Sequence, residues 1–355
     1  MDGVKVGLAL SGGGAKGAYQ VGVCKALQEL GARVDVIAGA SIGALNGAIL
    51  ASAPSFAKGT ARLEALWKTL DSCIKPNIFG HLLLLASAGA QISGFSAMER
   101  LAGLVHTGLD SRLGSMMPSG LAGSLMSSIS LLSDSPLHDL MQQYLDLDAL
   151  QKGLPLHVSA YRTNGPVLDL LSGLAAELGL ADTADAEFFH VQSLPREEQQ
   201  NALLASAALP VLFPTRKIGN ERYVDGGLGG LRRMQGNTPV APLLSAGCTH
   251  VIVTHLSDGS LWSRHDYPGT IFLEIRPQSD ITRDGTFSDM LGFKPGKITS
   301  WIKQGYDDAL HCLGRVKGMI ETHVKLDISK RNLWESLACS KEIDAATRAA
   351  VDRLK

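Results

Sequence analysis

Apolar and polar positions alternate in blocks along the chain, and the first two blocks near the N-terminus repeat one pattern. Residues 4–10 and 34–38 form short, mostly apolar runs, which are typical of buried strands. Each run passes through a glycine-flanked turn into a longer stretch that resembles a helix. The pattern of strand, tight turn and helix, used twice, predicts a parallel sheet with two helix N-termini at the same edge.

The same alternation returns in the second half of the chain. We expect strands at residues 155–161, 167–171, 187–191, 250–255 and 271–275, with helices such as residues 195–208 between them. Strands that alternate with helices favour an α/β fold in which helices cover both faces of a mainly parallel sheet.

A long region between these two parts, residues 55–152, has helical patterning. Within it, residues 82–85 and 116–126 are apolar, small and low in charge. One interpretation is a mobile helical cap over a site, in which flexible methionine side chains suit an acyl chain. The other is a set of core helices of an inserted bundle. We expect residues 1–277 to form one domain that contains this region.

Beyond residue 277 the pattern changes to loop and then helix, which predicts a helical C-terminal extension over residues 278–355. Residues 294–331 contain eight Lys or Arg and four Asp or Glu, a net charge of +4, beside Phe293 and Trp301. This cluster indicates contact with an anionic membrane surface or a partner. The alternative is a solvated helical face that packs on the sheet.

Composition narrows the class of protein. The 355 residues carry a formal net charge of −1, which gives no electrostatic basis for nucleic-acid binding. The five cysteines are scattered and include no C-x-x-C pair. They argue against a disulfide framework or a zinc site, and favour a reducing compartment.

The hydropathy pattern also bears on membrane association. No segment has the ~20 predominantly apolar residues that a bilayer-spanning helix needs. The N-terminal apolar run passes directly into the glycine-rich turn, so a cleaved signal peptide is not expected. We therefore expect a cytoplasmic or peripheral membrane protein, while secretion as an effector without a signal peptide stays open.

The two N-terminal turns carry the residues of a serine hydrolase site. Residues 11–17 read Ser-Gly-Gly-Gly-Ala-Lys-Gly, and residues 39–43 read Gly-Ala-Ser-Ile-Gly, which fits G-x-S-x-G. In that motif the serine sits on a sharp strand-to-helix turn, so Ser41 is the candidate nucleophile. Backbone N–H groups of the first turn can converge on an anion at the start of the next helix. For acyl transfer, that anion is the tetrahedral oxyanion.

Nucleotide-binding interpretations of the first turn are weaker. Gly12, Gly14 and Gly17 also fit G-x-G-x-x-G, but the dinucleotide motif expects an acidic residue at the end of the next strand. Asp35 lies near that spacing, yet inside the strand. A P-loop is excluded because Gly17 is followed by neither Lys nor Ser/Thr.

A conventional α/β-hydrolase is the stronger competitor, since it also uses the G-x-S-x-G turn. Its triad runs Ser, Asp/Glu, His along the chain, and several strands precede the nucleophile. Only one strand precedes the strand that leads to Ser41 here. His250 and His255 keep a triad open, but they flank an apolar run that reads as a buried strand, so we expect a structural role for them.

A third part of the chain decides between these alternatives. Residues 205–214 read Ala-Ser-Ala-Ala-Leu-Pro-Val-Leu-Phe-Pro, and residues 223–227 read Tyr-Val-Asp-Gly-Gly, an aspartate on a tight turn. In order, G-G-G-x-K/R-G, G-x-S-x-G and D-G-G resemble the patatin-like phospholipase family of the bacterial type. The apolar helix that ends in A-x-P-x-x-F-P is a further family feature. The resemblance covers roughly residues 4–260.

The resemblance implies a three-layer α/β/α patatin-like fold and a Ser–Asp dyad that needs no metal or cofactor. Carried over by position, Ser41 is the nucleophile and Asp225 is its base. The oxyanion loop then consists of Gly12, Gly13, Gly14 and Ala15. The supporting positions are Lys16, where the family has a basic residue, and Gly39, Gly43, Gly226 and Gly227.

One departure from the family pattern concerns the turn after Asp225. The family continues D-G-G-x-x-x-N-x-P, whereas Asn237 arrives twelve residues after Asp225. Either residues 228–236 are an insertion that loops out with Arg232 and Arg233, or Asn237 is not the equivalent residue. The arginine pair belongs either to a phosphate head-group contact or to a solvated loop.

Together these features predict a lipid acyl hydrolase of the phospholipase A or lysophospholipase type that works through an acyl-enzyme. The expected partners are a phospholipid or lysophospholipid substrate and a membrane surface, bound peripherally. A protein or small-molecule activator stays open. The alternative is a non-catalytic lipid-binding or scaffold protein of the same fold.

Overall fold

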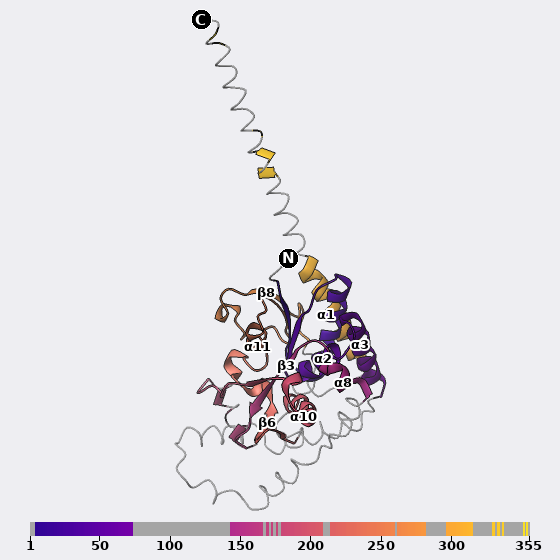
Figure 1. Ribbon diagram of the computed structural model, residues 1–355, viewed down its shortest axis with the longest axis vertical. Coiled ribbons are helices and arrows are strands. Elements are labelled where there is room, and N and C mark those ends of the chain that lie inside the picture. The colour runs from indigo at the N-terminus through magenta and orange to yellow at the C-terminus, as the bar shows by residue number, and fades with distance from the viewer. Residues whose placement is uncertain are drawn as a thin grey trace, which may run out of the picture. The chain divides into compact units, whose positions relative to one another are not determined.

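The computed structural model describes residues 4–73, 143–165, 179–208, 214–259, 261–281 and 296–314, with isolated residues between 168 and 176 and beyond 328 (Figure 1). Contacts divide the chain into two compact units, residues 1–308 and residues 309–355. The sheet and the candidate site belong to the first unit. The predicted domain division at residue 277 stays a prediction.

The predicted helical cap falls largely outside the described residues. Helix α3 (Phe56–Cys73) and helix α8 (Leu147–Gln151) are the described parts of residues 55–152. The apolar segments 82–85 and 116–126 lie outside the described residues. Both interpretations of this region therefore stay predictions.

The core of the first unit is a sheet whose described strands follow the order β5–β6–β3–β2–β1–β7–β8, with β4 also paired to β3. Five neighbouring strands pair in parallel: β3 (Leu156–Arg162), β2 (Val36–Gly39), β1 (Val6–Leu10), β7 (His250–Thr254) and β8 (Ile271–Ile275). The pairings at the other end are antiparallel and involve β4 (Glu187–His190), β5 (Arg216–Ile218) and β6 (Glu221–Asp225). The predicted mainly parallel sheet is confirmed.

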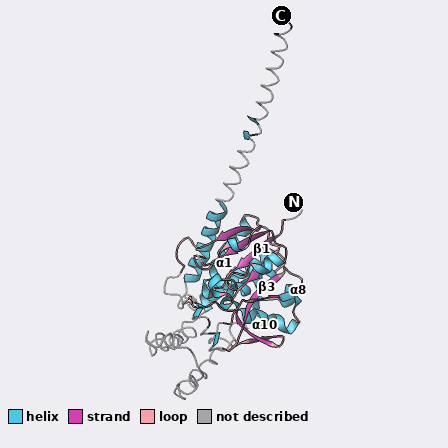
Figure 2. Cartoon of the chain, turned by 90° about the vertical axis from the view of Figure 1, so that its left-hand side faces the viewer, coloured by secondary structure: helices cyan, strands magenta, loops and turns pink. Residues whose placement is uncertain are grey.

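Helices cover both faces of this sheet. A Cβ added to Gly47 of helix α2 (Ile42–Ala51) would contact the side chain of Ile37. Helix α11 (Ala241–Ser245) instead packs Leu243 into a core cluster with Ala38, the next residue along β2. Because successive side chains of a strand point to opposite faces, α2 and α11 lie on opposite faces. Figure 1 shows β3 between α11 and α2, which confirms the α/β/α arrangement, and Figure 2 shows α1, α8 and α10 beside the strands.

Helix α2 is buried along nearly its whole length, from Gly43 to Ala51. It contacts β2 and β3 on one side and α3 on the other. A helix buried on all sides needs an apolar sequence without a polar face, and the mostly small, apolar sequence of α2 meets that need. Helix α1 (Ala18–Glu29) lies beside α3 and so belongs to the same layer.

Helical residues 297–308 pack against α1 at close range. A Cβ added to Gly22 of α1 would lie 1.9 Å from the carbonyl oxygen of Ile302. Trp301 is fully buried, and its Nε1 donates to the carbonyl oxygen of Ile281 at 3.2 Å. Trp301 is therefore a core residue, and the expectation that it contributes to a membrane-binding surface is wrong.

Two local predictions differ from the structure. The described residues of the strand expected at 167–171, Leu168 and Asp169, are helical. The Asp169 carboxylate accepts from the backbone N–H of Asn164 at 3.1 Å, and the Asp169 N–H donates to the Gly165 carbonyl oxygen at 2.9 Å. These contacts fold the segment back on the preceding turn. Strand β5 was not expected, because its three residues are too few for a periodic signal.

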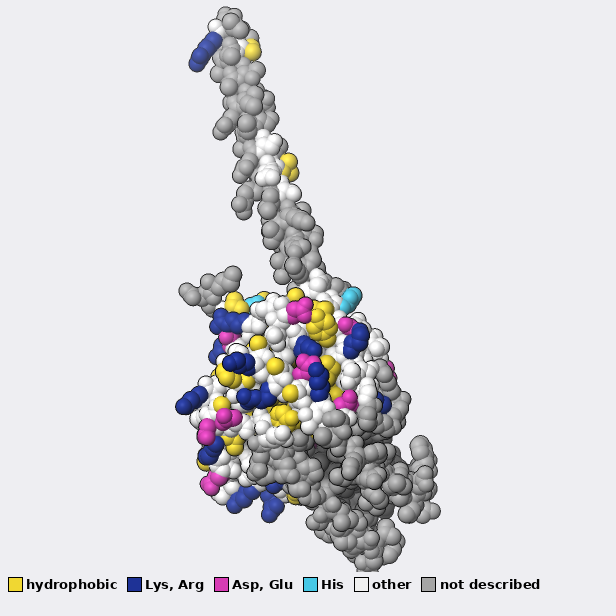
Figure 3. Space-filling view, turned by 90° about the vertical axis from the view of Figure 1, so that its right-hand side faces the viewer, with side chains coloured by type: hydrophobic (Ala, Val, Ile, Leu, Met, Phe, Trp, Pro, Cys, Tyr) yellow, Lys and Arg dark blue, Asp and Glu magenta, His cyan; other side chains and the backbone are white. Residues whose placement is uncertain are grey.

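Among the described residues, no helix combines the length and the apolar character needed to cross a bilayer. The face in Figure 3 carries basic and acidic side chains next to one another, in keeping with a formal net charge of −1.

Candidate active site

Ser41 lies on a sharp turn between β2 and α2. Its φ of 52° and ψ of −125° are unusual, since Ser41 and Met234 are the only described non-glycine residues with positive φ. Such a conformation costs on the order of 1–3 kcal/mol and persists only where surrounding contacts hold it. Small neighbours allow it here: a Cβ added to Gly43 would lie 2.1 Å from the Leu10 carbonyl oxygen, and one on Gly39 would lie 2.3 Å from the Gly43 carbonyl oxygen.

The glycine-rich loop lies directly beside this turn. Strands β1 and β2 pair in parallel with Leu10 opposite Gly39, so the loops that follow them leave the sheet at the same edge. A Cβ added to Gly12 would lie 3.0 Å from the Ser41 Cβ. The loop then enters the 3-10 helix η1 (Gly14–Gly17), where Gly14 takes a φ of 59° that suits glycine.

The predicted oxyanion donors divide into two groups. The Gly12 N–H donates to the carbonyl oxygen of Asn237 at 3.2 Å. Gly13 and Gly14 lie at the start of η1, where backbone N–H groups have no acceptor within the helix. Ala15 is buried and belongs to η1, as does Lys16, whose exposed fraction is 7%. The N–H groups of Gly13 and Gly14 are thus better placed to bind an anion than that of Gly12.

Asp225 is the last residue of β6 and is buried, with 3% of its surface exposed. Its Oδ1 accepts from the Gly227 N–H at 2.8 Å. Its Oδ2 is buried and has no hydrogen-bond partner of regular geometry among the described residues. Burial raises the pKa of the Asp225 carboxyl to about 6, against smaller lowering effects of the Ser41 hydroxyl and the Gly227 N–H.

The structure therefore brings Ser41 and Asp225 together, although 184 positions separate them in the sequence. The Ser41 hydroxyl is close enough to lower the pKa of the carboxyl, without a fully formed hydrogen bond to Oδ2. Such contacts are often loose in the free protein and tighten when substrate binds. The residue after Asp225 must be a glycine, because there is no room for a side chain. A Cβ on Gly226 would lie 2.3 Å from the Ser159 hydroxyl oxygen.

The nine residues 228–236 loop out and return. The Gly236 N–H donates to the Gly229 carbonyl oxygen at 2.9 Å, which closes the loop at its base. Asn237 then lies beside both ends of the site: its Oδ1 would be 2.5 Å from a Cβ on Gly12 and 3.0 Å from one on Gly227. The structure favours the first of the two sequence interpretations, an insertion that leaves Asn237 next to the Asp225 turn.

The arginine pair of the insertion is held by acidic neighbours. The Arg233 guanidinium lies 2.9 Å from the Asp185 carboxylate and 3.7 Å from that of Asp182. The Arg232 backbone N–H also donates to Asp182, at 3.0 Å. These contacts describe a structured, exposed loop.

The histidines considered for a triad have other partners than Ser41 and Asp225, although His255 lines a cavity with Ser11 and Asn237. The Nε2 of His255 lies 3.3 Å from the Glu274 carboxylate, and its ring lies beside Trp262. His250 begins β7, and its Nδ1 lies 3.0 Å from the Thr249 hydroxyl. The structural role predicted for both agrees with these contacts.

A buried polar network that the sequence pattern did not reveal ties the glycine-rich loop to helices α1, α2 and α3. Gln20 Nε2 donates to the Ser11 carbonyl oxygen at 2.7 Å, and its Oε1 accepts from Asn46 Nδ2 at 2.8 Å. Asn46 also donates to the Gly17 carbonyl oxygen and accepts from Trp67 Nε1 at 3.0 Å. The available signal was Asn46 itself, an amide in an otherwise apolar helix, because buried polar groups require partners.

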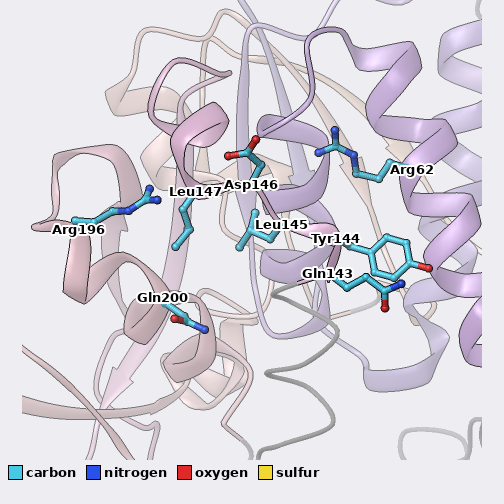
Figure 4. A pocket seen from close by; sticks show the side chains of 8 residues that line it. All are labelled: Arg62, Gln143, Tyr144, Leu145, Asp146, Leu147, Arg196 and Gln200. Carbon is cyan, nitrogen blue, oxygen red and sulfur yellow. The ribbon is translucent and has the colours of Figure 1, made fainter.

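Two of the cavities in the described part of the chain differ in their relation to the site. One, of about 230 Å³, is lined by residues that include Ser11 and Asn237, so it adjoins the glycine-rich loop. The other, of about 570 Å³, lies between α3, α8 and the start of helix α10 (Arg196–Ser206), and Figure 4 shows Arg62 and Arg196 on its opposite sides. None of the predicted site residues lines this second cavity.

Comparison with known proteins gives a family match. The sequence model of the family "Patatin-like phospholipase" matches residues 8–244, which is more than half of the chain. The lysophospholipase nte1 of Aspergillus terreus is 45% identical over 73 residues, which are 19% of this chain and 5% of that protein. The rat patatin-like phospholipase domain-containing protein 7 is 40% identical over 75 residues, 21% of this chain and 6% of that protein. The matched part is thus about a twentieth of the length of these relatives.

Among solved structures, the chain matches VipD from Legionella pneumophila with a TM-score of 0.40 and 16% identity. The match covers 88% of this chain and 67% of that one. The type III effector protein ExoU has a TM-score of 0.37 and 17% identity, over 88% of this chain and 53% of that one.

Proposed function

Because the chain belongs to the patatin-like phospholipase family, we propose that it hydrolyses acyl esters of phospholipids or lysophospholipids through a Ser41–Asp225 dyad. The observation that carries this proposal is the buried Asp225 carboxylate beside the Ser41 hydroxyl, next to the glycine-rich loop. Curated relatives with lysophospholipase or phospholipase in their names support the lipid class of substrate.

In the first half of the proposed reaction, Asp225 accepts the proton of the Ser41 hydroxyl while the serine oxygen attacks the ester carbonyl. The carbonyl oxygen becomes an oxyanion that the N–H groups of Gly13 and Gly14 face. One such donor is commonly worth about 3–4 kcal/mol in the transition state. When the intermediate collapses, Asp225 returns the proton to the departing alcohol, and the acyl group stays on Ser41.

In the second half, Asp225 accepts a proton from water, and the resulting hydroxide attacks the acyl-enzyme. The same loop faces the second oxyanion. Collapse releases the fatty acid, and the proton returns to Ser41. An ordinary aspartate is a weak base for these steps, and a pKa of about 6 brings Asp225 closer to the value that suits proton transfer near neutral pH.

The proposal is tested with defined phospholipids and lysophospholipids, whose products are identified by mass spectrometry. Ser41→Ala is expected to lower the rate at least about a thousandfold. Ser52→Ala is a matched control, because Ser52 is also buried but lies after the far end of α2. We expect it to keep near wild-type activity.

Labelling with a fluorophosphonate separates this proposal from a non-catalytic lipid-binding protein of the same fold. We expect covalent modification at Ser41 in the wild-type protein. Lipid binding without modification and without product would support the non-catalytic alternative. A metal chelator is expected to leave hydrolysis unchanged, since the proposed steps use only protein groups and water.

A further inference from the structure

One short turn bonds the backbones of both candidate catalytic residues. Ser206 is the last residue of α10, and its Oγ accepts a hydrogen bond from the backbone N–H of Ser41 at 3.0 Å. Two residues later, the carbonyl oxygen of Ala208 accepts from the backbone N–H of Asp225 at 2.9 Å. The turn itself is closed, because the Ala208 N–H donates to the Ala205 carbonyl oxygen at 3.0 Å.

The bond to Ser41 satisfies a donor that has no other acceptor available in its own helix. Ser41 is the N-cap of α2, so its N–H lies outside the intrahelical ladder. Ser41 and Ser206 are both buried, and a buried N–H without an acceptor is destabilising. The positive φ of Ser41 also needs contacts that hold it in place.

From this geometry we propose that Ser206 is a positioning residue, which fixes the separation between the Ser41 oxygen and the Asp225 carboxylate through the turn of residues 205–208. The inference rests on the proposed function of these two residues. Ser206 acts on the backbone of Ser41 and takes no part in proton transfer, so it is not a catalytic residue itself.

The proposal predicts an effect on the reaction step more than on folding. Without the Ser206 hydroxyl, the turn still bonds Asp225 through Ala208, but the Ser41 backbone is free to move away from it. A misplacement of about 1 Å between reacting groups can lower a rate on the order of a hundredfold. Ser206 is fully buried and so is not expected to contact substrate, which means that kcat should fall while KM changes little.

The test compares Ser206→Ala with Ser52→Ala. Ser52 is also buried, and its hydroxyl donates to the Ile49 carbonyl oxygen at 3.2 Å and accepts from the Arg62 guanidinium at 3.5 Å. Both variants therefore lose one buried hydroxyl and its hydrogen bonding. The measurements are the second-order rate of fluorophosphonate labelling at Ser41, kcat and KM for a defined lysophospholipid, the thermal unfolding midpoint, and amide hydrogen exchange at Ser41. We expect Ser206→Ala to lower the labelling rate and kcat roughly tenfold to a hundredfold. Ser52→Ala is expected to stay within about twofold of wild type.

The outcomes separate this inference from the proposed function. If Ser206→Ala is labelled as fast as wild type, the positioning role is overturned and the dyad still stands. The same holds if Ser206→Ala and Ser52→Ala lose equal activity in proportion to the fall in their unfolding midpoints. Slower labelling of Ser206→Ala in a protein that cleaves no lipid would support the positioning role and refute the lipase function. Should Ser206→Ala not fold, rapid exchange of the Ser41 amide in the wild-type protein would still overturn the inference, and protection of that amide would support it.

Discussion

Asp225 lies directly opposite Ala160 in the antiparallel pairing of β6 with β3. Strand β3 pairs on its other side, in parallel, with β2, the strand that leads to Ser41. One central strand therefore links the base and the nucleophile, and it does so at the point where the sheet changes from parallel to antiparallel. Asp225 is buried at this point, and its carboxylate accepts from the Gly227 N–H in the turn that follows β6.

The first prediction concerns the pH dependence of the reaction. The pKa of the Asp225 carboxyl is raised to about 6 by burial, and only the ionised form accepts the serine proton. We expect log(kcat/KM) to rise with unit slope below pH 6 and to level off above it. The rate of fluorophosphonate labelling at Ser41 should follow the same curve. A profile that is flat from pH 4.5 to 8 would exclude Asp225 as the base.

The second prediction concerns Asp225→Asn, which is expected to lose activity and gain stability. Because the folded-state pKa lies above the ordinary value of 3.8, the neutral carboxyl favours folding at low pH. That stability is lost as the pH rises through about 6. The shift of the Asp225 pKa from 3.8 to about 6 corresponds to a loss of roughly 3 kcal/mol. Asparagine carries no charge at any pH. At pH 8 the free energy of unfolding of the variant is therefore expected to exceed that of wild type by up to that amount.

Urea unfolding of Asp225→Asn and wild type at pH 4 and pH 8 checks the direction of this stability change. The difference in free energy of unfolding between the two proteins should be smaller at pH 4 than at pH 8. Asp185→Asn is a suitable control, because Asp185 is an exposed partner of Arg233. Exposed ion pairs contribute about 0–1 kcal/mol. A larger gain at pH 8 for Asp185→Asn than for Asp225→Asn would contradict the argument.

The third prediction compares two glycines of α2. A Cβ on Gly43 would meet the backbone carbonyl oxygen of Leu10 at 2.1 Å, which cannot be relieved by moving a side chain. A Cβ on Gly47 would meet only side-chain atoms, at 3.0 Å or more. We expect Gly43→Ala to lower stability by about 1–3 kcal/mol and to lower kcat strongly.

For Gly47→Ala, the gain in helix propensity of up to about 1 kcal/mol offsets the tighter contact, so its net effect should be small. Thermal unfolding and lipid hydrolysis of the two variants are measured side by side. If Gly47→Ala lowered stability or activity more than Gly43→Ala, the close backbone contact between α2 and β1 would not be what requires a glycine at position 43.

The fourth prediction concerns the insertion. A Cβ on Gly236 would lie 2.0 Å from the Gly226 carbonyl oxygen, so Gly236→Ala must displace either the insertion or the turn after Asp225. We expect kcat to fall by roughly tenfold or more, because the carboxylate moves with that turn. Arg232→Ala, at an exposed position of the same loop, should leave kcat within about twofold. Normal kcat for Gly236→Ala would show that the insertion does not constrain Asp225.

The elements that the sequence predicted well have local signals. The strands at β1 and β2 are short apolar runs followed by glycines, and the turn at Ser41 is specified by Gly39 and Gly43, whose missing side chains allow the backbone contacts there. The strands at β3, β7 and β8 were likewise predicted within a residue of their ends. In each case neighbouring residues alone carry the pattern.

The features that the sequence did not reveal depend on contacts between distant residues. Ser206 bonds to Ser41 across 165 positions, and nothing in the sequence around Ser206 indicates that partner. The antiparallel pairings of β3 with β4 and β6 have no signature in periodicity, because a strand's alternation is the same in both directions. The return of Asn237 to the Asp225 turn likewise depends on the closed base of the insertion.

The sequence by itself determined the α/β class, the two glycine-flanked turns and the identity of the candidate nucleophile and base, because these follow from residue type and short-range spacing. Only the tertiary structure decided how the carboxylate is buried, which N–H groups of the loop stay available, and what holds the Ser41 backbone. Burial and hydrogen-bond partners arise when strands far apart in the chain pack side by side. The raised pKa of Asp225, on which the chemistry depends, is therefore a property of the folded sheet edge and of no single segment.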